Sequence, residues 1–553
     1  MYISKITIKG YKSINQIDLH LNPNLNILVG KNGAGKTAII DCIKGTIIGF
    51  DTEKPQAVTI ELTDCDSLIQ NITSILKSDP AIVRLPALEQ YLKQSDKLKK
   101  IKINYDPYFG ASYVHLELIE INPEKITVNL QNNKLTILEH ATRDVDLNRV
   151  EKIKQLLTEK FLFIPEMRNF KEKFNDPTNL NETGENILTI TNIDQYNFLN
   201  LFKKMREDTG IKHKKYDEIV TQFEKEILPY KIIPKDNNQF KVSKIVAERD
   251  DNDTIISNTN SHIPSGILQE LFFKFVNIYA TKMEQTLIYE EPENNLHPGL
   301  QKKMASILKK RKGQTILTTH SEEFVDWQLF QNINLIKLYP ENNQEVTKIK
   351  SYEPKIKESE KSKKENINET NGMYYIDKRV LFSDLVLLCE GESEVRILKE
   401  ILLDTPTKIN VDLENILILD GMGEDKLESH KFILDAFNIP YLIIKDRKLH
   451  KQFLKCGWDK ENKRFILPGN DFTDLFKEKP TENKGYYSSK TVANYYLEKS
   501  KNKDKNILDY FKDEIKYDDD STLIEKPKER FNEMAETIQR LLKEGKSPKI
   551  TLN

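Results

Sequence analysis

Short apolar runs alternate with helical patterns through the first 350 residues of the chain. Residues 1–14 alternate between polar and apolar positions, and the run Leu25–Val29 predicts a buried strand. Further runs of strand length occur at 161–166, 286–290 and 314–321. Strands that alternate with helices along a chain are typical of an α/β fold with a parallel sheet.

A charged helical pattern interrupts this first domain, and a polar stretch ends it. Residues 199–228 have a helical pattern with many charges, which predicts a surface insertion at about 165–250; a partner-binding arm is the alternative. Lys and Glu dominate residues 352–371, and this composition predicts a linker over 351–380. The first domain should therefore span residues 1–350.

Beyond residue 380, short apolar strands again alternate with helical patterns. The predicted strands and helices follow one another at 384–389, 392–403, 416–419, 426–437 and 441–444. The order βαβαβ predicts a Rossmann-like unit with a parallel sheet, over residues 381–480. Residues 481–553 are polar and helix-prone, so we expect a helical C-terminal extension.

Charge and cysteine usage narrow the class of protein. The 84 Lys and Arg residues balance 85 Asp and Glu residues, for a formal net charge of -1, so any nucleic-acid site must be a local patch. The four cysteines form no C-x-x-C pair, which argues against a disulfide framework or a zinc site. No stretch approaches the roughly 20 apolar residues of a membrane span. We expect a soluble cytoplasmic protein that makes no membrane contact.

The segment Gly30–Thr37, GKNGAGKT, fits the phosphate-binding pattern G-x-x-x-x-G-K-[ST] between a predicted strand and a predicted helix. Its glycines allow the backbone N–H groups to face a phosphate, Lys36 should reach the β- and γ-phosphates, and the Thr37 hydroxyl should ligate Mg²⁺. A chance match is the alternative, which the flanking elements disfavour. The residues expected to bind ATP here are Gly30, Asn32, Gly33, Gly35, Lys36 and Thr37.

Hydrolysis needs a carboxylate near the metal and a group that activates water. Glu290 and Glu291 end an apolar strand, where a parallel sheet places its ligands, so we assign Glu290 to the metal and Glu291 to the base. His320 ends the next strand and is placed to contact the γ-phosphate. Ser265 and Gly266 precede a predicted helix and could bind the phosphate of a second molecule. Taken singly, each residue is also compatible with an ordinary surface role.

The second unit has acidic residues at the same kind of edge. Glu390 follows one strand, Glu394 lies in the first turn of the next helix, and Asp446 ends another strand. Three carboxylates on one sheet edge predict a site for Mg²⁺ or Mn²⁺ that supports phosphodiester cleavage. The alternative is a set of strand-end acids that face water.

The motifs of the first domain together resemble the ATP-binding-cassette class of ATPases, in particular its SMC-like branch. EEPENNLHP is similar to the extended Walker B segment, TTHS to the histidine switch, and IPSGILQ, with Ser265, Gly266 and Gln269, to a signature loop. In that class two heads enclose two ATP molecules. The resemblance therefore implies a homodimer or a higher homo-oligomer formed through the ATPase heads.

The second unit resembles a Toprim domain. CEGESE is similar to its glutamate motif, LDGMGEDK to the turn after its second strand, and IIKDRK to its Asp-x-Asp motif, with Lys448 where the family has a second Asp. Either Glu390, Glu394 and Asp446 hold one Mg²⁺, or Asp471 and Asp474 complete the metal site. An SMC-like ATPase followed by Toprim is the arrangement of the OLD (overcoming lysogenization defect) nucleases, including Gabija A-like and retron-associated antiphage effectors. Those nucleases carry a further lysine, for which Lys490 is the candidate.

The resemblance implies an ATP-dependent, metal-dependent DNA endonuclease in antiphage defence, with an accessory defence protein or a retron component as a further partner. Two alternatives stay open. In the first alternative, which Lys448 favours, the Toprim domain is degenerate and only binds nucleic acid or a partner. In the second, the chain is an SMC-like DNA-repair ATPase. The absence of a sustained heptad run counts against the repair ATPase.

Overall fold

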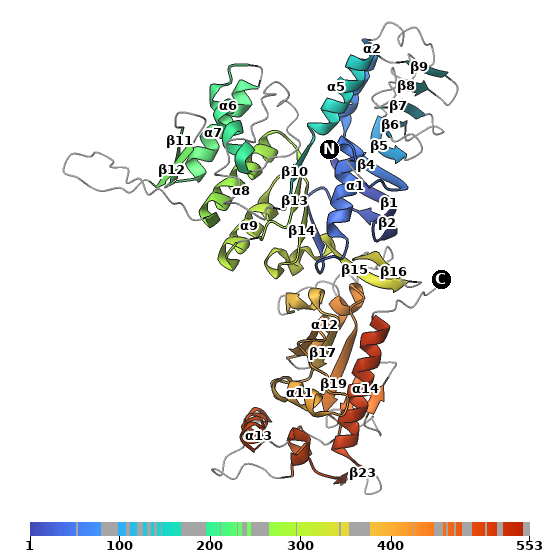
Figure 1. Cartoon of the computed structure of the whole chain (residues 1–553), viewed down its shortest axis with the longest axis vertical. Coiled ribbons are helices and arrows are strands. Elements are labelled where there is room, and N and C mark those ends of the chain that lie inside the picture. The colour runs from blue at the N-terminus through green and yellow to red at the C-terminus, as the bar shows by residue number, and fades with distance from the viewer. Residues whose placement is uncertain are drawn as a thin grey trace, which may run out of the picture. The chain divides into compact units, whose positions relative to one another are not determined.

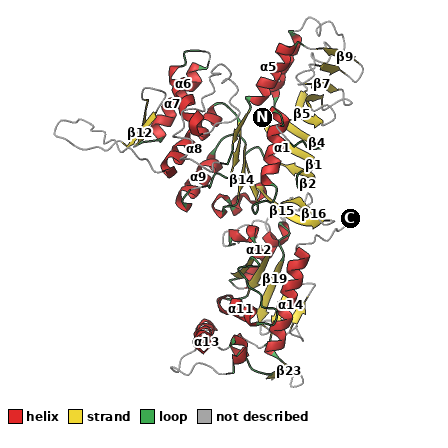
Figure 2. Cartoon of the chain, viewed as in Figure 1, coloured by secondary structure: helices red, strands yellow, loops and turns green. Residues whose placement is uncertain are grey.

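In the computed structural model the chain forms two compact units. The first unit contains residues 1–325, 332–338 and 347–349, and the second contains residues 326–331, 339–346 and 350–553. Helices and strands alternate in both (Figures 1 and 2). No helix among the described residues is long and apolar enough to cross a membrane. The structure describes residues 1–50, 53–78, 98–106, 111–118, 125–129, 134–137, 141–144, 146–166, 195–210, 212–228, 230–234, 240–244, 265–294, 296–341, 344–352, 376–422, 424–446, 457–459, 463–468, 472–477, 489–503, 506–516 and 524–545.

The first unit contains an antiparallel sheet in the order β2-β1-β4-β5-β6-β7-β8-β9. Its strands are β1 (Tyr2–Tyr11), β2 (Ile14–His20), β4 (Ala57–Thr63), β5 (Leu98–Asp106), β6 (Ala111–Leu118), β7 (Lys125–Asn129), β8 (Lys134–Ile137) and β9 (Ala141–Asp144). The alternation of apolar positions in β1 and β4 gives this sheet one buried face.

A second, mostly parallel sheet has the order β10-β13-β14-β3-β15-β16. Its strands are β3 (Leu25–Val29), β10 (Phe161–Ile164), β13 (Thr286–Glu290), β14 (Thr315–Thr319), β15 (Ile333–Glu341) and β16 (Gln344–Ser351). Strands β3, β10, β13 and β14 run parallel, so their carboxyl ends share one edge. This topology brings together segments that lie almost 300 residues apart in the sequence.

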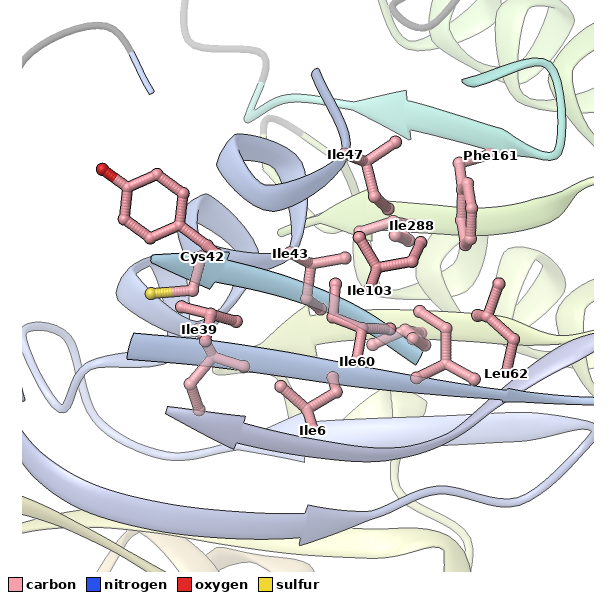
Figure 3. Packing of buried hydrophobic residues seen from close by; sticks show 14 of the residues in the cluster. Ile6, Ile39, Cys42, Ile43, Ile47, Ile60, Leu62, Ile103, Phe161 and Ile288 are labelled. Carbon is pink, nitrogen blue, oxygen red and sulfur yellow. The ribbon is translucent and has the colours of Figure 1, made fainter. Parts of the chain in front are cut away.

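Helix α1 (Lys36–Ile48) is buried between these two sheets. Its isoleucines at positions 39, 43 and 47 recur every four residues and form one stripe. Figure 3 shows this stripe next to Ile60 and Ile103 of the antiparallel sheet and to Ile288 and Phe161 of the parallel sheet. Because this core fixes α1, it also fixes the loop that precedes the helix. Helices α2 (Asp66–Lys77) and α5 (Leu147–Thr158) pack against each other beside it.

The predicted helical insertion contains α6 (Gln195–Glu207) and α7 (His213–Glu226), which pack on α8 (Ser265–Lys282) through rings of Phe202, Phe223 and Phe275. The strands β11 (Tyr230–Pro234) and β12 (Phe240–Lys244) form a hairpin of their own. The helix α9 (Pro298–Lys310) and the short helices η3 (Glu322–Phe324) and η4 (Trp327–Asn332) follow. One expectation was wrong in detail: Ser265 and Gly266 form the first turn of α8 and do not precede the helix.

The second unit has a five-stranded sheet in the order β18-β17-β19-β21-β20. Strands β17, β18, β19 and β21 are parallel, and β20 pairs antiparallel to β21. The elements are η6 (Lys378–Phe382), β17 (Leu385–Cys389), α11 (Glu392–Asp404), β18 (Ile416–Asp420), α12 (Glu424–Ala436), β19 (Tyr441–Asp446), β20 (Gly457–Asp459), β21 (Arg464–Leu467), η8 (Phe472–Leu475), α13 (Ser489–Lys503), η9 (Ile507–Tyr510), β22 (Ile515–Lys516), β23 (Ile524–Glu525) and α14 (Pro527–Gly545). The predicted α/β fold class is confirmed for both units.

Candidate active sites

The phosphate loop joins β3 to α1, as the sequence predicts. Gly33 and Gly35 have φ values of 76° and 103°, in the left-handed region that glycine adopts at little cost. Gly30 is required for space: a Cβ there would lie 2.2 Å from the carbonyl oxygen of Ile336. The α1 N-terminus follows directly, so unpaired helical N–H groups face the loop and favour an anion.

Lys36 lies inside the loop and is almost fully buried, with 4% of its side chain exposed. Its Nζ donates to the carbonyl oxygens of Gly30, at 2.9 Å, and Lys31, at 3.0 Å. Burial lowers the pKa of Lys36, while the nearby carboxylate of Glu291 opposes this shift. A buried ammonium group with these contacts suits a site that takes a phosphate.

Glu290 ends β13 beside this loop, and Glu291 follows the strand directly. Burial raises the pKa of Glu290 to about 7, and the charge of Asp41 adds to the shift. Glu291 has a φ of 42°, which is strained for glutamate, and its N–H donates to the Thr318 carbonyl at 3.0 Å. Its carboxylate Oε1 lies 3.9 Å from Lys36 Nζ. The structure therefore brings the predicted base to the predicted phosphate-binding lysine.

His320 lies at the end of β14, with 38% of its side chain exposed. Its Nδ1 is 3.7 Å from Glu291 Oε2 and 3.3 Å from Glu293 Oε1. Glu293 also accepts hydrogen bonds from the His320 N–H and the Thr319 hydroxyl, both at 2.7 Å. Its side chain is 3% exposed, and its Oε2 has no hydrogen-bond partner in the described part of the chain. Glu293 thus fixes the histidine backbone, a role that we did not predict.

Glu166 is a second residue that the sequence reasoning missed. It follows β10, the neighbour of β13, and its Oε1 accepts from Asn294 Nδ2 at 2.8 Å. The same amide donates to Glu291 Oε2 at 3.2 Å. An acid directly after a buried strand of a parallel sheet was the available signal. The site edge therefore carries Glu166 as well as the predicted glutamates.

The remaining predicted nucleotide ligands lie in two places, the phosphate loop and the start of α8. Asn32 and Thr37 are exposed at the loop, and a threonine hydroxyl is an oxygen ligand of the kind that Mg²⁺ accepts. Gln269 is 3% exposed in α8, and its Oε1 has no hydrogen-bond partner among the residues that the structure describes. Ser265, Gly266 and Gln269 all lie in the first two turns of α8. Their role toward a second molecule stays a prediction.

In the second unit, β17 is buried along its whole length, and Glu390 follows it directly. The Glu390 N–H donates to the Ile444 carbonyl at 3.1 Å. Glu394 lies in the first turn of α11 and is 5% exposed. A Cβ on Gly391 would lie 3.3 Å from Glu394 Oε2, so this carboxylate folds back over the strand end. Both predicted acids therefore lie at one edge of the sheet, with oxygens that suit Mg²⁺.

Neighbouring strands bring two more acids to this edge. Cys389 is in register with Asp420 of β18 and with Ile444 of β19, and Asp446 ends β19. Asp420 was not predicted, although LDGMGEDK contains it; its Oδ1 accepts from the Met422 N–H at 2.8 Å. The backbone register therefore adds Asp420 to the candidate edge.

Several predicted residues fall outside the described part of the chain. Lys448 and Asp471 are not described, and neither are the side chains of Asp446 and Lys490, although their backbones lie in β19 and α13. Asp474 lies in η8. Among the described residues, no three His, Cys, Asp or Glu side chains form a group that could hold a metal ion. The complete ligand set of the second site stays a prediction.

Two family models match the chain. The model described as AAA ATPase domain matches residues 1–325, more than half of the sequence. The model described as Overcoming lysogenization defect protein-like, TOPRIM domain matches residues 381–447. These matches cover the phosphate loop with Glu291 and His320, and the sheet edge with Glu390 and Asp446.

Curated relatives and solved structures are also similar to parts of the chain. The DNA replication and repair protein RecF of Psychromonas ingrahamii is 27% identical over 128 residues, which are 23% of this chain and 34% of that protein. RecF of Halalkalibacterium halodurans is 35% identical over 134 residues, 23% of this chain and 33% of that protein. The chain thus spans about a third of the length of these relatives. The SMC head domain from Thermotoga maritima has a TM-score of 0.30 and 12% identity, covering 64% of this chain and 100% of that one.

Proposed function

This chain belongs to the AAA ATPase domain family and carries an Overcoming lysogenization defect protein-like TOPRIM domain, and we therefore propose that it is an ATP-hydrolysing, divalent-metal-dependent DNA endonuclease. ATP would bind at Gly30–Thr37, and the second unit would cleave or nick DNA. The observation that carries the ATPase proposal is the convergence of Lys36, Glu291 and His320 at one sheet edge.

In this proposal Glu291 takes the proton of the attacking water and His320 contacts the γ-phosphate. Thr37 and Glu290 would hold the Mg²⁺ of the nucleotide. Asn294, which donates to both Glu291 and Glu166, keeps the base oriented. Glu293 keeps His320 at the strand end through its backbone N–H. These contacts supply the positioning that phosphoryl transfer needs, because the protein contributes geometry and charge more than covalent chemistry.

Glu390, Glu394 and Asp446 are the proposed metal ligands of the nuclease site, with Asp471 and Lys490 as further candidates. A divalent ion, Mg²⁺ or Mn²⁺, would supply an activated water and stabilise the departing oxygen. The position of Glu394 at the strand end, beside Gly391 and close to Glu390 in the sequence, supports this assignment, because carboxylate oxygens at one sheet edge are the ligands that Mg²⁺ takes.

Three finer proposals concern the assembly and its role. Two ATPase heads would form a homodimer or a higher homo-oligomer in which Ser265, Gly266 and Gln269 of one head bind the nucleotide of the other. Nucleotide state would gate access of DNA to the second unit. The biological role would be antiphage defence in the cytoplasm, with an accessory defence protein or a retron component as a further partner.

Plasmid cleavage tests the nuclease proposal. Supercoiled and linear plasmids are incubated with the protein in Mg²⁺ or Mn²⁺, with no nucleotide, ATP or a non-hydrolysable analogue. We expect Glu390→Gln to abolish cleavage. The matched control Glu392→Gln removes one negative charge two residues away, at an exposed position paired with Arg396, and should cleave like the wild type. Equal cleavage in all nucleotide conditions would refute gating.

Specific observations support two other functions. Lys448 in place of a metal ligand supports a domain that binds nucleic acid or a partner without cutting. The similarity to RecF proteins supports a DNA-repair ATPase. An absence of cleavage in every condition, with ATP hydrolysis intact, would favour the first. Loss of phage resistance in a Glu390→Gln strain with unchanged survival of DNA damage would contradict the second.

A further inference from the structure

The β15–β16 hairpin packs against both ends of the phosphate loop. At the first end, the carbonyl of Ile336 in β15 occupies the space that a Cβ of Gly30 would need. At the second end, a Cβ on Gly35 would lie 2.4 Å from Oγ1 of Thr347 in β16. The Thr347 residue is 1% exposed. The outer side of the loop is therefore in van der Waals contact with this hairpin.

Thr347 also makes a directed hydrogen bond to the loop. Its Oγ1 donates to the carbonyl oxygen of Ala34 at 3.0 Å and lies 2.7 Å from the hydroxyl of Ser13. Since a threonine hydroxyl has one hydrogen, Ser13 is the donor in the second contact. The Thr347 N–H in turn donates to the Ser13 carbonyl at 2.7 Å. Ser13 and Thr347 thus form a relay that ends on the Ala34 carbonyl.

The orientation of one peptide group follows from this relay. In a trans peptide the C=O of Ala34 and the N–H of Gly35 point in opposite directions. A carbonyl held on β16 therefore turns the Gly35 N–H away from β16 and toward the inner side of the loop. Because glycine adopts positive and negative φ about equally well, the backbone at Gly35 does not by itself hold the Ala34–Gly35 peptide in one orientation. An external anchor is needed to keep the N–H in place.

We propose that Thr347 is a positioning residue for phosphate binding, which acts by fixing the Ala34–Gly35 peptide so that the Gly35 N–H faces the nucleotide. The proposal rests on the proposed function of Gly30–Thr37 as an ATP site. It extends the site to a strand that lies more than 300 residues later in the sequence. No sequence motif marks Thr347, since its contribution depends on the register of β16 against the loop.

The test compares three variants of the full chain. Thr347→Val keeps the shape and removes the hydroxyl, Thr347→Ser keeps the hydroxyl, and Thr73→Val is the matched control. Thr73 is a buried threonine in α2 whose Oγ1 has no hydrogen-bond partner among the described residues, so its replacement removes a buried hydroxyl outside the loop. The dissociation constant of a fluorescent ATP analogue, and KM and kcat for ATP, are measured with Mg²⁺.

We expect Thr347→Val to raise the ATP dissociation constant and KM roughly 3- to 10-fold, the range for one lost hydrogen bond, with kcat changed less than about 2-fold. Thr347→Ser and Thr73→Val should both bind like the wild type. Ser13→Ala, which removes the outer donor of the relay, should weaken binding about 2-fold, and this variant also serves if Thr347→Val does not fold.

Wild-type affinity in Thr347→Val would overturn the proposal. Equal weakening in Thr347→Val and Thr347→Ser would overturn it too, because packing and not the hydroxyl would then control the loop. Failure of the wild type itself to bind ATP would instead refute the proposed function. The two failures are therefore distinguishable in one experiment.

Discussion

Replacement of Glu290 by glutamine should stabilise the protein in a pH-dependent manner when no divalent ion is present. The pKa of this glutamate is raised from 4.5 to about 7, mainly because burial disfavours its charged form. Below pH 4.5 the carboxyl is protonated in both the folded and the unfolded chain, so its titration has no effect on stability. As the pH rises to about 7, the unfolded chain loses its proton first, and the folded state becomes less stable relative to the unfolded state.

The size of this effect follows from the shift. At about 1.4 kcal/mol per pKa unit, the folded wild type should lose up to roughly 3 kcal/mol by pH 8, and less than about 1 kcal/mol at pH 5. Glu290→Gln cannot ionise at this position and should escape the loss. The variant should therefore be more stable than the wild type at pH 8, and this advantage should be about three to four times smaller at pH 5.

Urea unfolding in EDTA at pH 5 and pH 8 measures this difference. The transition that belongs to the ATPase unit is identified as the one that ATP with Mg²⁺ shifts in the wild type. Glu322→Gln, which removes an exposed acid from the same unit, controls for net charge. A difference between Glu290→Gln and the wild type that is the same at both pH values, or larger at pH 5, would refute the reasoning.

Three further predictions concern the same site. Gly30→Ala would place a Cβ 2.2 Å from the Ile336 carbonyl oxygen. We expect this variant to lose about 2 kcal/mol or more of unfolding free energy, the upper range for overpacking, and also to lose ATP binding. Gly33→Ala meets no atom within 4 Å and should cost only about 1 kcal/mol for its positive φ; equal melting temperatures of the two variants would contradict this ranking. Glu293→Gln should lower the ATPase kcat about 10-fold or more and leave the ATP dissociation constant within about 2-fold of the wild-type value. The reason is that it weakens the charged hydrogen bond that fixes the His320 backbone. A single-turnover assay in which the variant hydrolyses ATP at the wild-type rate would disprove this role.

The elements with a strong local pattern could be predicted from the sequence. The phosphate loop carries its own signature, and the flanking runs Leu25–Val29 and 38–43 have the lengths and compositions of a strand and a helix. The βαβαβ order of the second unit was predicted for the same reason, since each of its strands is a short apolar run with a turn after it. Fold class therefore followed from local hydrophobic patterns.

Residues whose role depends on neighbouring strands could not be predicted. Glu293 lies in a polar stretch after β13, and only the pairing of β13 with β14 brings it to His320. Glu166 meets Asn294 because β10 pairs with β13. The helix start at Ser265 was missed because local patterns fix an element boundary only within a few residues. The contacts of Glu293 and Glu166 arise from strand pairing, and the local sequence shows at most that an acid follows a buried strand.

The order of strands around β3 has a consequence for the synthesis of the protein. Both sheet neighbours of β3 come late in the chain, because β14 and β15 begin at Thr315 and Ile333. Thr315 lies 289 residues after Asn26, so at roughly 5–20 residues per second a ribosome needs about 15–60 s to make the strand that pairs with β3. During that interval the apolar residues of β3 lack the two strands that bury them in the finished fold. The nascent chain therefore acquires its phosphate loop early and a folded nucleotide site late, once β14 and β15 have been synthesised.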